Sequence, residues 1–168
     1  MQICTIMFLS AKDSSDLENK IQEPKEDVTM VQLIVGSKGD GKTKHLLDRV
    51  NSQIKTASGN IVYLDKSQKH MHELSNKVRL INVGDYPISN CDEFLGFICG
   101  IVSQDYDLQE MYLDSFLTIA NLADDQLVHA IEKLDIISEK FNVKFVLSVS
   151  KDEADLPECA KARLIVSL

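Results

Sequence analysis

From Val31 onward, short apolar runs alternate along the chain with longer amphipathic segments. The short runs are rich in β-branched residues and end at turn residues, which is typical of strands. The longer segments carry apolar residues at helical spacing. The expected strands are residues 31–35, 61–64, 78–83, 110–113, 143–149 and 163–168, and the expected helices are residues 43–54, 91–103 and 124–141, with a weak helical stretch through Met71 and Leu74.

This order of elements predicts the fold class. Strands joined through helical segments of this length imply parallel pairing by right-handed crossovers. We therefore expect an α/β fold of three layers, with helices on both faces of a mostly parallel sheet of about five to six strands. The chain of 168 residues is long enough for one substantial core, so residues 30–168 are expected to form a single domain. Residues 1–29 show no sustained period and predict a poorly ordered extension.

One segment carries a complete chemical motif. Residues 36–43 match G-x-x-x-x-G-K-[ST], and they lie between the first predicted strand and the first predicted helix, where a Walker A loop belongs. Glycines let the backbone wrap a polyphosphate with its N–H groups, and the helix start adds its positive dipole end. Lys42 is expected to reach the β and γ phosphates and Thr43 to offer its hydroxyl to Mg²⁺. The expected nucleotide-binding residues are Gly36, Ser37, Lys38, Gly39, Asp40, Gly41, Lys42, Thr43 and Lys44.

A P-loop needs a second anchor for Mg²⁺, usually an Asp at the end of another apolar strand. Asp114 follows such a run and is the predicted anchor, whereas Asp65 ends a similar run and is the alternative. Ser115 stands where many P-loop hydrolases have a Glu, so we expect slow hydrolysis. Ser148 and Ser150 end a later strand, where they can face either the γ-phosphate or solvent.

Charge and composition exclude several other classes. The net charge is −8 and the sequence pI is about 4.9, so nucleic acid and anionic membranes are not expected partners. Residues 3–9 are apolar but too few to span a bilayer, which predicts a cytoplasmic protein without membrane insertion. The four cysteines lack CxxC or zinc spacing, and His70 and His72 have no partner identifiable from spacing and are expected to be a surface pair.

With the segment 36–43 and Asp114, the chain resembles compact P-loop NTPases of the RecA-like or thymidine-kinase-like type. Residues 31–106, including the run 97–106, are similar to small uncharacterised ATP-binding proteins of Firmicutes that are often labelled twitching-motility, or pilus-retraction, ATPases. The resemblance implies nucleotide binding. The Asp-Glu pair of thymidine kinases is replaced here by Asp114 and Ser115, and their zinc-binding cysteine quartet has no counterpart.

Two functional hypotheses follow from these residues. The first is a protein that binds Mg²⁺-ATP, hydrolyses it slowly and acts as a nucleotide-dependent switch or regulator. The second is a small-molecule phosphotransferase in which Asp65 or Asp85 is the base on an acceptor hydroxyl. ATP is favoured over GTP because the sequence has no N/T-K-x-D motif for guanine. The sequence carries no signal for a protein partner or for an oligomeric state.

Overall fold

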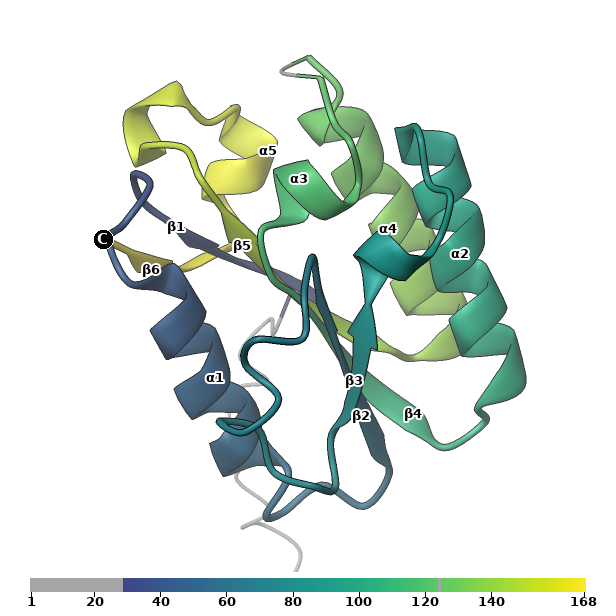
Figure 1. The fold of residues 1–168 in the computed structure, drawn as a ribbon. Helices are drawn as coiled ribbons and strands as arrows, with labels where there is room; N and C mark the ends of the chain where they lie inside the picture. The colour runs from purple at the N-terminus through teal and green to yellow at the C-terminus, as the bar shows by residue number, and fades with distance from the viewer. Residues whose placement is uncertain (1–28, 124) are drawn as a thin grey trace, which may run out of the picture.

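The computed structural model describes residues 29–123 and 125–168, so the expected extension at residues 1–29 lies outside the described residues except for Thr29. Figure 1 shows the chain. Its strands are β1 (Val31–Val35), β2 (Asn60–Asp65), β3 (Arg79–Asn82), β4 (Leu108–Leu113), β5 (Lys144–Val149) and β6 (Leu164–Ser167). Its α-helices are α1 (Lys42–Gln53), α2 (Cys91–Gln104), α3 (Phe116–Ile119), α4 (Leu127–Phe141) and α5 (Glu158–Lys161), and 3₁₀ turns lie at Val83–Asp85 and Glu153–Asp155.

The strands form one six-stranded sheet in the order β3-β2-β4-β5-β1-β6, and every neighbouring pair is parallel. The α/β class predicted from the sequence is confirmed, and the sheet is parallel throughout. Because the strands all run the same way, their carboxyl ends meet along one edge of the sheet. The loops that follow β1, β2, β4 and β5 share that edge, and β5 lies between β1 and β4.

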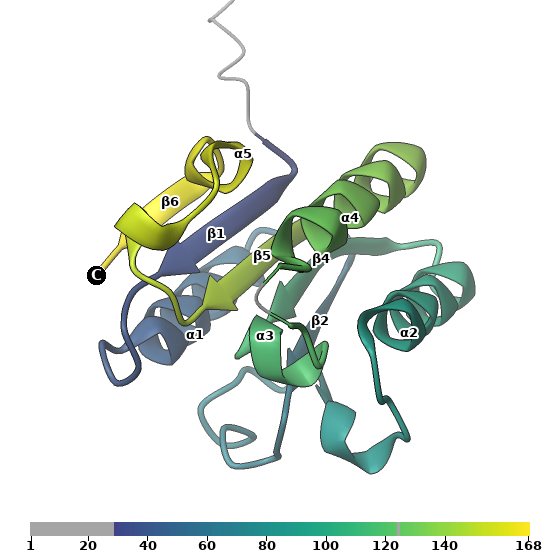
Figure 2. The same ribbon diagram turned by 90° about the horizontal axis from the view of Figure 1, so that it is seen from above.

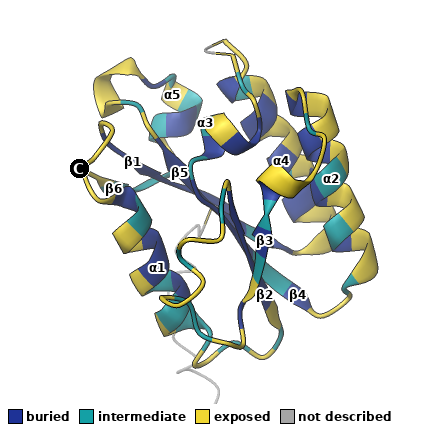
Figure 3. Ribbon diagram, in the orientation of Figure 1, coloured by how far each residue is buried: buried dark blue, intermediate teal, exposed yellow. Residues whose placement is uncertain are grey.

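Helices cover both faces of the sheet and make three layers (Figure 2). One face carries α1, which packs through Leu46, Leu47 and Val50, and the other carries α2, α3, α4 and α5. Successive residues of β1 alternate between the two cores, so Leu33 lies under the four helices and Ile34 lies under α1. All of β1 is buried, as expected of a strand covered on both faces, and Figure 3 shows exposed residues mainly on the outer sides of helices and in loops.

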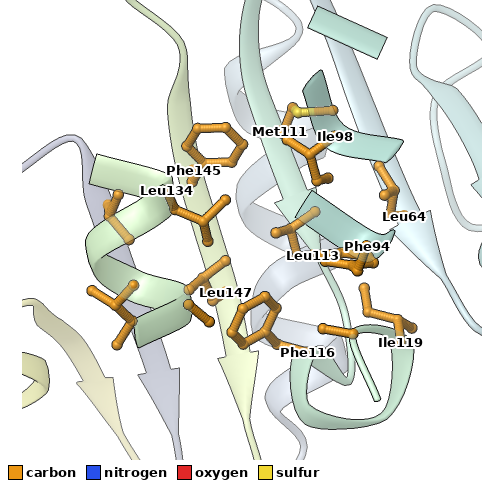
Figure 4. Packing of buried hydrophobic residues seen from close by; sticks show 14 of the residues in the cluster. Leu64, Phe94, Ile98, Met111, Leu113, Phe116, Ile119, Leu134, Phe145 and Leu147 are labelled. Carbon is orange, nitrogen blue, oxygen red and sulfur yellow. The ribbon is translucent and has the colours of Figure 1, made fainter. Parts of the chain in front are cut away.

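The larger core fixes the chain immediately after β4. Phe94 of α2 meets Phe116 of α3 edge to face, with ring centroids 6.0 Å apart, beside Leu113 of β4 (Figure 4). Full burial of such a side chain stabilises the fold by about 1.5–3 kcal/mol. Phe116 lies two residues after Asp114, so its burial holds the carboxyl end of β4 in place.

The prediction of a weak helical stretch through Met71 and Leu74 is wrong. Residues 66–77 form mainly turns and bends, with hydrogen bonds from Met71 N to Gln68 O and from Glu73 N to His70 O. Leu74 packs against the core under α1, whereas Met71 is 51% exposed. A segment with so few apolar residues has no apolar helical face to bury, so it does not form a helix. Its conformation is determined by local turn hydrogen bonds and by the packing of Leu74.

Other differences from the predicted elements are small. β4 begins at Leu108 and α4 begins at Leu127, and just before α4 the backbone N–H of Ala123 donates to Gln126 Oε1 at 3.1 Å. The helices α3 and α5 have four residues each, too few to show a period in the sequence. Among the described residues no helix is long and apolar enough to cross a membrane. The described cysteines, Cys91, Cys99 and Cys159, are free thiols, and Cys4 lies outside the described residues.

Gly59, just before β2, is expected to tolerate no side chain. A Cβ there would lie 2.1 Å from the backbone oxygen of Asp107, so Gly59→Ala must push the two segments apart. We expect Gly59→Ala to lower the free energy of unfolding by about 1–3 kcal/mol in urea titrations. Gly96→Ala is the control: nothing lies within 4 Å of that position in α2, so alanine should stabilise by about 0.5–1 kcal/mol. Equal stability of Gly59→Ala and the wild type would contradict the close approach.

Candidate functional site

The loop between β1 and α1 has a backbone that depends on glycine. Gly39 has φ +104° and Gly41 has φ +87°, a region that other residues rarely adopt. Gly36 is buried, and a Cβ there would lie 3.0 Å from the Cβ of Leu168, next to β6. The loop is therefore held between two strands at its start and curls tightly where it enters α1.

The N-terminus of α1 is open. Gly41 occupies the N-cap position, none of the described side chains caps it by a hydrogen bond, and no acidic residue lies in the first turn. The first backbone N–H groups of a helix have no partner within the helix, and they carry the positive end of its dipole. An anion such as a phosphate group can therefore be bound at this point.

Lys42, the first residue of α1, bends back over the loop. Its side chain is buried, and Nζ donates to Gly36 O at 2.8 Å and to Ser37 O at 2.6 Å. Desolvation lowers the pKa of Lys42, and the carboxylates of Asp40, Asp114 and Asp152 act in the opposite direction. The loop carbonyls thus hold the ammonium group close to the open helix start.

Thr43 and Asp114 meet although they are far apart in sequence. Thr43 Oγ1 donates to Asp114 Oδ1 at 3.1 Å, and Ser148 Oγ of β5 donates to the same oxygen at 2.6 Å. Tyr63 OH of β2 donates to the other oxygen, Oδ2, at 3.3 Å. A hydroxyl and a carboxylate side by side are the oxygen ligands that Mg²⁺ prefers, so this pair fits a magnesium ion.

Ser115 connects this carboxylate to α3. It has φ +55°, the left-handed region, and turns the chain sharply from β4 into the helix. Its backbone N–H donates to Asp114 Oδ1 at 2.8 Å and to Ser148 Oγ at 2.7 Å. These two hydrogen bonds tie the N-cap residue of α3 to Asp114 and Ser148.

Asp65 is the second buried carboxylate at this edge of the sheet. It ends β2, next to β4, and is 1% exposed. Oδ1 accepts from Lys66 N at 2.6 Å, whereas Oδ2 has no hydrogen-bond partner among the described residues. Desolvation, followed by the negative charge of Asp114, raises the pKa of Asp65. The sequence offered Asp65 and Asp114 as alternatives, and the structure brings both to one place.

These groups surround a cavity of about 500 Å³, which we call the strand-end pocket. Its lining residues are Lys38, Gly39, Gly41, Lys42, Thr43, Asp65, Lys66, Lys69, Asp114, Ser115, Leu117, Thr118, Ser148 and Ser150. The other residues predicted for the nucleotide site do not line it: Gly36, Ser37, Asp40 and Lys44. Ser37 instead donates from Oγ to Asp152 Oδ1 at 2.7 Å. Asp85, the other proposed base, is exposed and accepts from Asn82 outside the lining.

Several pocket residues were not singled out from the sequence. Lys66 and Lys69 belong to the loop after β2, and the only signal for them was that Lys66 directly follows a strand-ending Asp. The expected surface pair of histidines holds for His72, which is exposed, but not for His70. The His70 side chain is 15% exposed, and Nδ1 lies 2.7 Å from Glu73 Oε1.

Asp65→Asn is expected to stabilise the protein at neutral pH in the absence of divalent ions. Because the folded state raises the pKa of Asp65, folding is most favourable when this carboxyl is protonated, and stability is lost as the pH rises. The amide keeps an acceptor for Lys66 N and does not titrate. We expect a gain of about 1–3 kcal/mol in urea unfolding at pH 7, the scale of an unsatisfied buried group.

That gain should shrink toward about pH 4, near the ordinary pKa of an aspartate. An Asp65→Asn variant that is no more stable than the wild type at pH 7, or whose advantage grows toward acid pH, would contradict this account of Asp65.

The chain was compared with protein-family models, curated proteins and solved structures, and only the structures gave matches. No family model matches the sequence, and no curated protein matches it, so neither comparison supports the resemblance to proteins labelled twitching-motility ATPases. Among solved structures, PCH-2 of C. elegans matches with a TM-score of 0.47 and 12% sequence identity. The match covers 84% of this chain and 34% of that one, so this chain corresponds to about a third of PCH-2.

Proposed function

We propose that this chain binds Mg²⁺-ATP through residues 36–44, hydrolyses it slowly and acts as a nucleotide-dependent switch. One observation carries the proposal: the open N-terminus of α1, the glycine loop and the Thr43–Asp114 pair all face the strand-end pocket. An anion site and a pair of oxygen ligands for a hard cation, side by side, suit a metal-complexed polyphosphate.

Each group has a physical role in this proposal. The backbone N–H groups at the start of α1 would donate hydrogen bonds to the phosphate oxygens, and Lys42 would extend its contacts from the loop carbonyls to the β and γ phosphates. Thr43 and Asp114 would hold Mg²⁺, which neutralises phosphate charge and orders the oxygens around it. The Thr43 hydroxyl can continue to donate to Asp114 while its lone pairs face the ion.

Slow hydrolysis is supported by where the acidic groups lie. Ser115 offers no carboxylate beside Asp114, and the pocket's second carboxylate is Asp65, on the neighbouring strand. Oδ2 of Asp65, which has no hydrogen-bond partner among the described residues, is a carboxylate oxygen that can accept a proton from an attacking water. We therefore assign water polarisation to Asp65.

The switch role is supported by the contacts of Asp114. This carboxylate would help to hold Mg²⁺, and its Oδ1 accepts a hydrogen bond from the backbone N–H of Ser115, the N-cap residue of α3. Leu117 and Thr118 of α3 also line the pocket. Binding and loss of nucleotide can therefore bias the position of α3.

The alternative, a phosphotransferase acting on a small acceptor, is favoured by one feature of the pocket. Its lining continues past the P-loop to Asp65 on one side and to Leu117 and Thr118 on the other, which leaves room for an acceptor beside a polyphosphate. In that case Asp65 would take the proton of an acceptor hydroxyl. ATP consumption that rises only when an acceptor is supplied would distinguish this function from the switch.

Mg²⁺-ATP is expected to raise the thermal stability of the wild type by several degrees. A ligand at about 100 times its Kd stabilises the folded state by about 2.7 kcal/mol. Lys42→Ala should abolish most of the shift, because the ammonium group is lost from the loop. Lys55→Ala, an exposed lysine beyond the end of α1, is the matched control and should shift like the wild type. An equal shift in Lys42→Ala would contradict the site, as would no shift with ATP, GTP or ADP at millimolar concentration.

Asp65→Asn is expected to lower phosphate release by about a hundredfold, the usual contribution of a positioned base. The wild type should itself turn over below about 1 per second, slower than a typical enzyme. The ATP-induced thermal shift should persist in the variant, because Asp65 is not part of the P-loop. Phosphate release at the wild-type rate by Asp65→Asn would remove Asp65 from the mechanism.

A further inference from the structure

A second cluster of ligand-type side chains lies on the β2 side of the strand-end pocket. Asp65, His70 and Asp114 each offer one ligand atom, and these atoms all lie within 4.8 Å of one another. Asp65 and Asp114 are buried, and His70 is half-buried. Ligands around an ion at about 2.1 Å lie roughly 3 Å apart, so an approach of about 1–2 Å would complete a site.

The Asp65 carboxylate points to an additional ligand. It is 1% exposed, and its Oδ1 is tied to Lys66 N, which fixes the orientation of the group. Its Oδ2 is buried without a hydrogen-bond partner among the described residues. Buried carboxylate oxygens are almost always hydrogen-bonded or bound to a metal, so this oxygen is available as a ligand for a cation.

Asp114 can contribute to this cluster through its second oxygen. Oδ1 accepts from Thr43, Ser148 and the backbone of Ser115, so it is directed at the P-loop and β5. Oδ2 is close to Tyr63 of β2, two residues before Asp65 and on the same face of that strand. Oδ1 of Asp114 thus lies toward the glycine loop and β5, whereas Oδ2 lies toward Tyr63 and β2.

His70 is held as metal-binding histidines usually are. Nδ1 lies 2.7 Å from Glu73 Oε1, and a proton on Nδ1 leaves the lone pair of Nε2 free for a metal. A carboxylate on the far ring nitrogen fixes the tautomer and makes the imidazole a better ligand. His70 lies in residues 66–77, which form mainly turns and bends, so no helix or strand hydrogen-bond ladder holds its backbone.

We propose that Asp65, His70 and Asp114 bind a first-row transition-metal ion of the Zn²⁺ or Mn²⁺ class, with Glu73 positioning His70. One imidazole with two carboxylates suits such ions, whereas Mg²⁺ and Ca²⁺ favour oxygen ligands alone. The site shares Asp114 with the Mg²⁺ expected with the nucleotide, but it uses the Oδ2 side of that carboxylate, and it needs neither Lys42 nor a bound phosphate. Its metal binding can therefore be tested without nucleotide, and an ion bound there would occupy the Asp65 oxygen to which water polarisation is assigned.

The test is calorimetric titration of the full-length chain, freed of metal with a chelator and without nucleotide, using Mn²⁺ and Zn²⁺ in separate arms. We expect one ion per chain in each arm, retained in millimolar Mg²⁺, with Zn²⁺ binding more tightly than Mn²⁺ as the general order of divalent-metal affinities requires. His70→Ala should weaken binding at least tenfold, and Glu73→Gln about tenfold. His72→Ala, at the exposed neighbour, is the matched control and should bind like the wild type.

Co²⁺ absorption spectra of the same proteins report whether a nitrogen ligand is present, and they should lose that signature in His70→Ala. Circular dichroism of each variant separates a lost site from a lost fold. Asp65→Asn, which is expected to be at least as stable as the wild type, provides a second loss of binding. No binding of either ion, or binding unchanged by His70→Ala and Asp65→Asn, would overturn the proposal.

Discussion

The hydrogen bond between Thr43 and Asp114 is the contact on which the rest of the site depends. It joins the start of α1 to the end of β4, across the intervening strand β5, whose Ser148 donates to the same oxygen. The contact exists because every strand of the sheet is parallel, so that β1, β4 and β5 deliver their following loops to one edge. If β1 and β4 ran in opposite directions, Thr43 and Asp114 would lie at opposite ends of the sheet, and if β5 alone were reversed, Ser148 would be lost from the site.

The two buried carboxylates at this edge are treated differently by the fold. In Asp114, Oδ1 accepts hydrogen bonds from two hydroxyl groups and a backbone N–H, and Oδ2 accepts one from Tyr63. In Asp65, one oxygen accepts from Lys66 N and the other has no partner among the described residues. The first is a supported anchor and the second is a group with remaining binding capacity. The chain as a whole carries a net charge of −8. The pocket lining differs, because four lysines, Lys38, Lys42, Lys66 and Lys69, outnumber its two aspartates, so the local charge is positive and attracts anions.

Local signals were enough to predict where the glycine loop and the strands lie and that Thr43 and Asp114 come close together, because a glycine motif is contiguous in sequence and a strand-ending Asp is visible beside its apolar run. The sequence did not show that Asp65 and Asp114 lie on neighbouring strands, because strand order is set by crossovers between distant segments. Nor did it place His70 near them. That position depends on turns in residues 66–77, where two apolar residues suggested a helix that has no face to bury.

The most direct test of the central claim is an NMR titration of this 18.8 kDa chain with Mg²⁺-ATP, following the backbone amide signals. If the loop binds the phosphates, the largest chemical-shift changes will fall on the amides of Gly39, Gly41, Lys42 and Thr43, which would donate hydrogen bonds to the phosphate oxygens. The amide of Ser115 should shift less. Amide signals of residues 36–44 that stay unchanged at millimolar Mg²⁺-ATP, or the largest shifts on another part of the molecule, would contradict it.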